Sequence, residues 1–97
     1  MLTSLDFASR HSLTPIARII AQASHAQAPE WFTTAPASSI RKALEKARLK
    51  AADIDLYEIN EAFSVVALAC IKEMQLDESK VNVRGGAVAL GHPLGAS

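Results

Sequence analysis

Cysteine is nearly absent from this 97-residue chain, and its scarcity excludes two kinds of stabilising chemistry. The single cysteine, Cys70, cannot form an internal disulfide, and no Cys/His spacing resembles a metal site. A surplus of charge of one sign is also missing, because ten basic residues balance ten acidic ones. That balance lacks the basic excess that is typical of nucleic-acid binding. We therefore expect no metal and no nucleic-acid partner.

Long apolar runs are missing as well. No run reaches the roughly 20 residues that a membrane-spanning helix needs, and no cationic region precedes an apolar core as in a secretory signal. We expect no membrane association and a cytoplasmic location. Hydrophobic residues still make up 49% of the chain, a normal share for one small globular domain.

Apolar residues at helical spacing predict three helices. The first covers residues 1–12, and the second covers residues 36–47, where charged side chains occupy the opposite face. The third, residues 62–74, is almost wholly apolar in its first three turns, so we expect it to be buried on most sides. Cys70 lies within this third helix, and we interpret it as an inert core residue.

The segments between these helices predict extended chain and loops. Residues 56–59 and 81–83 are short apolar runs typical of strands, and residues 28–36 form a loop interrupted by two prolines. Residues 14–23 are ambiguous, because their Thr-Pro pair suits a helix start whereas their Ile-Ile pair suits a strand.

Glycine is confined to one stretch, residues 82–97, which holds all four glycines of the chain. Within it, His92 stands between Gly91 and Pro93. Glycine permits close backbone approach and proline fixes the backbone, so the string aims an imidazole from a stiff loop. Such a histidine acts as an acid or base near neutral pH. The same string is also typical of an ordinary turn with an exposed histidine.

A second polar string, Asn60-Glu61-Ala62-Phe63, follows the predicted strand at 56–59. Ligands gather at such strand ends in α/β proteins, and an asparagine amide there can donate to a developing oxyanion. The alternative is that Asn60 caps the following helix and that Glu61 is a first-turn acid favoured by the helix dipole.

These two strings, Asn60 to Phe63 and Asn82 to Ser97, resemble signature elements of the thiolases, which are CoA-dependent acyltransferases that make or cleave 3-ketoacyl-CoA. The resemblance runs from about Ala8 to Ser97. It implies an α/β fold: an incomplete thiolase-like C-terminal domain in which helices pack on a mixed sheet. Residues 14–23 then become a strand. After a terminal helix remnant at 1–12, residues 13–97 would run strand-helix-strand-helix-strand into the Gly-His-Pro loop.

The resemblance also implies roles for individual residues. Catalytic roles fall on His92, which would activate a nucleophilic cysteine, and on Asn60, which would hold a water against the thioester oxygen. Supporting roles fall on Glu61, Gly91 and Pro93. Substrate-binding roles fall on Ala62 and Phe63.

The implied reaction is ping-pong acyl transfer between CoA thioesters, in which two acetyl-CoA give acetoacetyl-CoA and CoA, or the reverse. CoA thioesters are then substrates, and no other cofactor is expected. Neither of the family's two catalytic cysteines matches Cys70, so both must lie outside these 97 residues. We expect the chain to be a C-terminal-half fragment that is inactive alone. Its partners would be the N-terminal half of a thiolase or other protomers of a homo-oligomer.

Two alternatives remain open. The chain would be a non-catalytic module that docks on a thiolase protomer or binds CoA without turnover. Or it would be a relative of the ketoacyl synthases, which share the fold but usually carry histidine where this sequence has Asn60.

Overall fold

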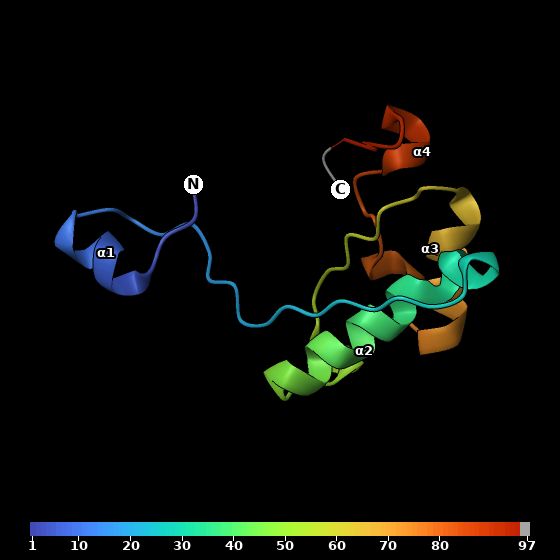
Figure 1. Cartoon of the computed structure of the whole chain (residues 1–97), viewed down its shortest axis with the longest axis horizontal. Helices are drawn as coiled ribbons and strands as arrows, with labels where there is room; N and C mark the ends of the chain where they lie inside the picture. The colour runs from blue at the N-terminus through green and yellow to red at the C-terminus, as the bar shows by residue number, and fades with distance from the viewer. Residues whose placement is uncertain (96–97) are drawn as a thin grey trace.

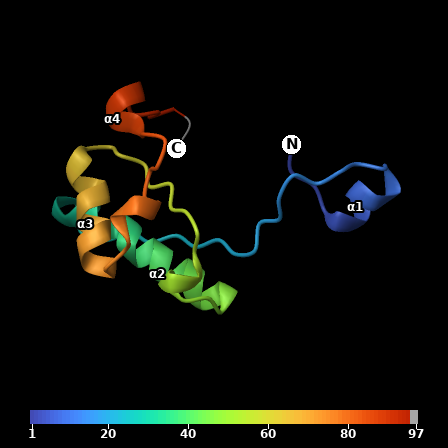
Figure 2. The ribbon, with the colours of Figure 1, turned by 180° about the vertical axis from the view of Figure 1, so that it is seen from behind.

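The chain folds into a helical body and an extended N-terminal arm, as a computed structural model that describes residues 1–95 shows (Figure 1). The arm, residues 1–24, carries the short helix α1 (Leu5–Arg10) away from the body, residues 25–95. The view from behind shows the same separation (Figure 2). The principal extents of 46 × 30 × 29 Å follow from this elongated arrangement.

The core of the body lies where α2 (Ala35–Ala47) meets α3 (Ser64–Met74). Ala37 and Cys70 are both 0% exposed at this contact, so the small side chain of Ala37 lets the two helices approach closely. The other buried members of the cluster are Tyr57, Ile59, Val66 and Leu76. The remaining elements of the body are three 3-10 turns and a short helix: η1 (Pro29–Thr34), η2 (Ala51–Asp53), η3 (Glu78–Lys80) and α4 (Ala87–Leu90).

One parallel bridge, between Tyr57 and Val81, joins two extended segments of the body. The Tyr57 N–H donates to the Lys80 carbonyl and the Asn82 N–H donates to the Tyr57 carbonyl, both at 2.8 Å. This pairing brings the residues after Ile59 beside the start of the glycine-rich stretch, and so it positions the candidate site.

The predicted mixed sheet is absent from residues 1–95, where the Tyr57–Val81 bridge is the only β pairing. The strand predicted for residues 14–23 is therefore wrong, because these residues lie in the arm without regular secondary structure. The strands predicted at 56–59 and 81–83 are reduced to that bridge. A strand needs neighbours for its backbone N–H and C=O groups, and nothing else in the described chain pairs with these segments.

The arm reaches the body along α2 and is held there by lysine side chains. The ammonium of Lys46 donates to the carbonyl of Gln22 at 3.0 Å, and that of Lys42 donates to the carbonyl of Ser24 at 3.4 Å. From residue 21 to residue 27 the odd-numbered residues are half-buried and the even-numbered ones exposed. This alternation is that of extended chain lying on a surface.

The helices lie close to where the periodicity places them. α1 falls within the predicted 1–12, α2 starts one residue before the predicted 36–47, and α3 starts two residues inside the predicted 62–74. The loop predicted at 28–36 contains the 3-10 turn η1, which proline suits because its φ is already helical. The short helix α4 was not predicted.

The prediction that α3 is buried on most sides is wrong. Val66, Ala67 and Cys70 are buried, but Val65 is 51% exposed and Leu68 is 58% exposed. The reason is that α2 and η1 cover one side of the helix. The opposite side of α3 is an exposed apolar face.

Truncation of the buried face of α3 should destabilise the body much more than the same change on its exposed face. Val66→Ala removes two buried methyl groups beside Cys70, and we expect the free energy of unfolding to fall by about 1.5 kcal/mol. The matched control Val65→Ala should change it by less than about 0.5 kcal/mol. Urea unfolding followed by circular dichroism measures both, and equal losses would contradict this packing.

Candidate active site

The side chains of Asn60 and His92 meet in space although 32 residues separate them in the chain. The Nδ2 of Asn60 lies 3.1 Å from the Nδ1 of His92. Asn60 directly follows the buried Ile59, and His92 follows α4. Gly91 has a φ of 93°, a conformation that glycine adopts without strain, and it turns the chain so that His92 points back at Asn60.

With the Asn60 amide oriented as in the structure, this contact sets the imidazole tautomer. An amide nitrogen can only donate, so the Nδ1 of His92 accepts and the ring hydrogen lies on Nε2. The Nε2–H is then a donor for an oxygen. Rotation of the Asn60 amide by half a turn presents its oxygen to a hydrogen on Nδ1, which leaves Nε2 able to accept a proton. The pair is therefore compatible with both tautomers of the neutral ring.

Asn60 does not cap α3, so that alternative is excluded. The N-terminal cap of α3 is Phe63, and no side-chain hydrogen bond caps the helix there. Glu61 likewise precedes the helix and is not a first-turn acid. Both residues lie in the short connection between the bridge at Tyr57 and the start of α3.

Glu61 instead connects Asn82 to α4 through its carboxylate. Its Oε1 accepts from the Nδ2 of Asn82 at 3.0 Å, and its Oε2 accepts from the N–H of Val88 in α4, also at 3.0 Å. The hydrogen bond from Val88, followed by that from Asn82, lowers the pKa of Glu61 below its ordinary value. The carboxylate therefore stays charged at neutral pH.

Gly86 makes room for this carboxylate. A Cβ at position 86 would lie 2.6 Å from the Oε2 of Glu61 and 2.7 Å from its carboxyl carbon, so no other residue fits without displacing Glu61. The backbone N–H of Val88, two residues on, is the donor to the same oxygen. The carboxylate of Glu61 thus requires a glycine at position 86, 25 residues away in the sequence.

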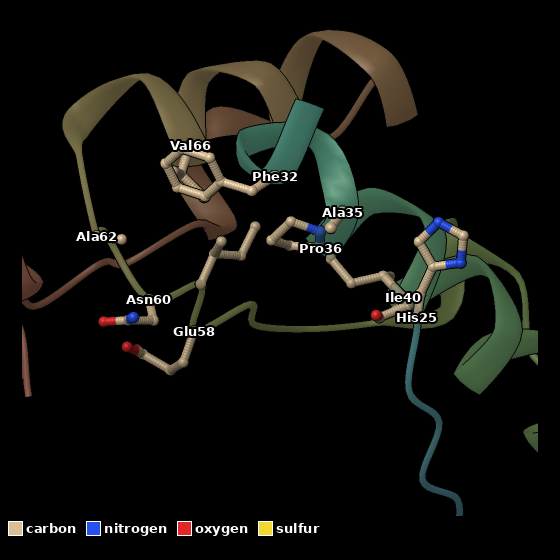
Figure 3. A pocket seen from close by; sticks show the side chains of 11 residues that line it. His25, Phe32, Ala35, Pro36, Ile40, Glu58, Asn60, Ala62 and Val66 are labelled. Atoms are coloured by element: carbon tan, nitrogen blue, oxygen red, sulfur yellow. The ribbon is translucent and has the colours of Figure 1, made fainter. Parts of the chain in front are cut away.

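Two open pockets lie on either side of Asn60. The first, of about 410 Å³, is lined mostly by apolar side chains, with Phe32, Pro36, Ile40 and Ala62 among them, and Asn60 lies at its edge (Figure 3). The second, of about 560 Å³, is lined by residues of the glycine-rich stretch, including Gly91 and Pro93. Asn60 and Glu58 are therefore polar residues that line both the apolar pocket and the glycine-lined one.

The residues predicted to bind substrate lie beside the first pocket. Ala62 lines it directly. Phe63 is 61% exposed, and its ring meets the edge of Phe32 with the ring centroids 6.1 Å apart. The structure thus gathers Asn60, His92 and Ala62 in one region, with Phe63 at its rim; their catalytic and binding roles stay predictions.

Sequence reasoning assigned no role to Asn82 or to Gly86. Asn82 is the first residue of the glycine-rich string, and its φ of 48° is in the left-handed region that asparagine tolerates better than most residues. An asparagine just before a Gly-Gly pair was the available signal. Its partners, Ile59 and Glu61, are distant in sequence and were not visible.

The structure adds two findings on metals and membranes. Within residues 1–95, no group of three or more His, Cys, Asp or Glu side chains lies close enough to hold a metal ion. None of the described helices is long and apolar enough to cross a bilayer.

Solved structures place this fold in the thiolase class. The Acat5 thiolase from Ascaris suum, solved in complex with coenzyme A, is 51% identical and superimposes with a TM-score of 0.93 over 97% of this chain and 25% of its own. Human mitochondrial 3-ketoacyl-CoA thiolase is 45% identical, with a TM-score of 0.90 over 94% of this chain and 23% of its own.

The chain belongs to the thiolase C-terminal domain family, whose model matches residues 13–97. The probable acetyl-CoA acetyltransferase of Dictyostelium discoideum is 53% identical over the whole chain, and acetyl-CoA acetyltransferase 1 of Arabidopsis thaliana is 55% identical. This chain spans 23% of the length of each of these relatives. A similar relative from Danio rerio is named mitochondrial, so a cytoplasmic location stays a prediction for this chain.

The carboxyl group of Glu61 should titrate below the range of an ordinary glutamate. A lowered folded-state pKa stabilises the fold at pH values above the unfolded-state pKa of about 4.3. That stabilisation is lost as the pH falls through the folded-state pKa. Side-chain carboxyl NMR gives the pKa directly. Below pH 4 the stability of Glu61→Gln should fall less than that of the wild type, because the variant has no carboxyl group at position 61 to protonate. It should still fall, because Asp77, whose pKa is also lowered, titrates in both proteins. An ordinary pKa for Glu61 would contradict the hydrogen bonds described.

Gly86→Ala should release Glu61 from Val88. The added methyl group occupies the position of the carboxylate, so we expect the pKa of Glu61 to rise toward its ordinary value and the urea midpoint to drop. Gly95→Ala is the matched control, because a Cβ there meets no heavy atom within 4 Å. If both variants kept the wild-type Glu61 pKa, the close approach at Gly86 would be wrong.

Proposed function

We propose that this chain supplies the asparagine and histidine of a thiolase active site, which transfers an acyl group between CoA thioesters. The observation that carries the proposal is the 3.1 Å contact between Asn60 and His92, two residues from separate loops that meet beside an open pocket. Membership of the thiolase C-terminal domain family gives this contact its chemical context.

In this function Asn60 and His92 would stabilise a thioester oxygen, and His92 would also transfer a proton. An Nε2–H on His92 donates to the oxygen as negative charge develops on it, and the amide of Asn60 holds the ring or a water beside it. The same imidazole takes a proton from an attacking thiol when Nε2 is unprotonated. Pro93 fixes the backbone φ directly after the ring and limits how far the ring can turn away.

Cys70 does not supply the attacking thiol. It is 0% exposed, and burial is the main cause that raises the pKa of its thiol, so it is both covered and protonated near neutral pH. Because it is the only cysteine of the chain, a covalent acyl intermediate needs a thiol from another part of a longer polypeptide or from another chain.

The partner that fits this requirement is the N-terminal half of a thiolase. The chain spans 23% of its relatives, so most of their length lies outside the matched region. The exposed apolar face of α3, with Val65 and Leu68, is surface of the kind that another domain covers. Within an intact assembly we propose that this face packs against the missing half or another protomer.

The substrates we propose are acetyl-CoA and acetoacetyl-CoA, with no further cofactor. Two relatives are named acetyl-CoA acetyltransferases, and the Ascaris suum thiolase was solved with coenzyme A. In this chain the apolar pocket bordered by Asn60, Phe32 and Ala62 suits a short acyl group or the end of the pantetheine arm. The thioester oxygen would then lie at the polar edge of that pocket.

Complementation tests this function. The chain alone should give no measurable thiolysis of acetoacetyl-CoA, whereas co-expression with the remaining segments of an acetyl-CoA acetyltransferase, which would carry both catalytic cysteines, should restore it. In that assembly His92→Ala should lower kcat by about 10² or more, and Asn60→Ala by about 10² to 10³. Loss of acetoacetyl-CoA absorbance follows the reaction.

The matched control is His11→Ala, because His11 stacks on Phe7 at the end of α1, in the arm and outside the body that contains Asn60. It should keep the activity of the assembly. A soluble, stable assembly without turnover would contradict the catalytic proposal, as would a His92→Ala variant as active as the wild type.

A non-catalytic role is the second candidate, and the exposed apolar face of α3 favours it. In that case the chain docks on a thiolase protomer but adds nothing to turnover. The complementation assay separates the two, because a docking module would bind the other segments of the enzyme without restoring thiolysis.

A further inference from the structure

Asn82 binds the backbone on one side of the candidate site. Its Oδ1 accepts from the N–H of Ile59 at 2.7 Å, and its Nδ2 donates to the carbonyl of Ile59 at 2.9 Å. A single side-chain amide thereby satisfies both backbone groups of the residue that directly precedes Asn60. The two peptide groups that flank the Cα of Ile59 are both held, and one of them joins Ile59 to Asn60.

The same carboxamide reaches the other side of the site through Glu61. Its Nδ2 also donates to the Oε1 of Glu61, whose Oε2 accepts from the N–H of Val88. Val88 lies in α4, which ends at Leu90, and His92 follows two residues later. A continuous path of hydrogen bonds thus leads from Ile59 through Asn82 and Glu61 to α4, the helix that precedes the histidine.

We propose that Asn82 is a positioning residue whose carboxamide, together with Glu61, forms a clamp that holds Asn60 against His92. Its importance for turnover rests on the proposed acyl transfer. Asn60 is exposed and His92 is half-buried, so the surrounding packing alone does not hold the two side chains together. Two such side chains lose conformational freedom when they meet, and fixed backbones on both sides reduce that loss.

The backbone at Asn82 allows a clean substitution. Its φ of 48° is costly for most residues but open to glycine, so Asn82→Gly removes the carboxamide without adding backbone strain. Asn82→Asp keeps the acceptor for Ile59 but removes the donors and sets a second carboxylate against Glu61. Tyr57→Phe is the matched control, since it deletes one hydrogen bond to a backbone carbonyl, that of Ala51, away from His92.

NMR on the 97-residue chain tests the clamp without any assay of activity. The wild type should show a nuclear Overhauser effect between the Asn60 side-chain amide and the His92 ring, and Tyr57→Phe should keep it. Asn82→Gly and Asn82→Asp should lose it while the Tyr57 amide, which donates to Lys80, stays protected from exchange. Persistence of the effect in Asn82→Gly would overturn the proposal. So would loss of Tyr57 protection in both variants, because Asn82 would then hold the whole fold.

Kinetics in the complemented assembly separate this proposal from the proposed function. Asn82→Gly should lower kcat by about 10- to 100-fold with KM within about twofold of the wild type, because displaced catalytic groups slow the chemical step. A general loss of folding would instead reduce the amount of active assembly and leave its kcat unchanged. If NMR shows the clamp but His92→Ala is fully active, the acyltransferase proposal fails and the clamp stands. If His92→Ala is inactive but Asn82→Gly has wild-type kcat, the clamp fails and the acyltransferase proposal stands.

Discussion

The pairing of the segment around Tyr57 with the segment around Val81 is the constraint on which the candidate site depends. Two backbone hydrogen bonds of 2.8 Å and the carboxamide of Asn82 fix these segments side by side. Asn60 leaves one segment directly after the pairing, and the glycine-rich stretch leaves the other. The buried Tyr57 and Ile59 anchor the first segment in the core, so the core between α2 and α3 supports the site indirectly.

Backbone conformation and charge complete what the pairing begins. The positive φ values at Asn82, Gly85 and Gly91 turn the chain within ten residues and return His92 toward Asn60. The carboxylate of Glu61 is balanced by two N–H donors, from Asn82 and Val88, and no ion pair holds it within residues 1–95. Dipoles held by a fixed backbone stabilise a charge without the flexibility of a lysine or arginine side chain. Gly86 is required because this carboxylate occupies the space of a side chain.

The fold divides into features with local causes and features without them. The helices at 35–47 and 64–74 were predictable because their apolar residues recur with the helical period. The strands were not, because a strand forms only when a neighbour accepts its hydrogen bonds. Residues 14–23 have the β-branched composition of a strand, yet they lie exposed in the arm without a pairing partner in the described chain. Val65 and Leu68 are exposed for the same reason. An apolar pattern predicts that a face is buried, but it does not identify the segment that covers this face.

For the candidate site, the sequence by itself determined the chemical groups: an asparagine before a helix, a histidine between glycine and proline, and glycines that free the backbone around it. Those features follow from neighbouring residues and were readable as strings. Only the tertiary structure decided that Asn60 meets His92, that Asn82 binds Ile59, and that Glu61 reaches Val88. These contacts span 23 to 32 residues. No local pattern specifies them, because they arise when the pairing of Tyr57 with Val81, supported by the core between α2 and α3, brings distant loops together.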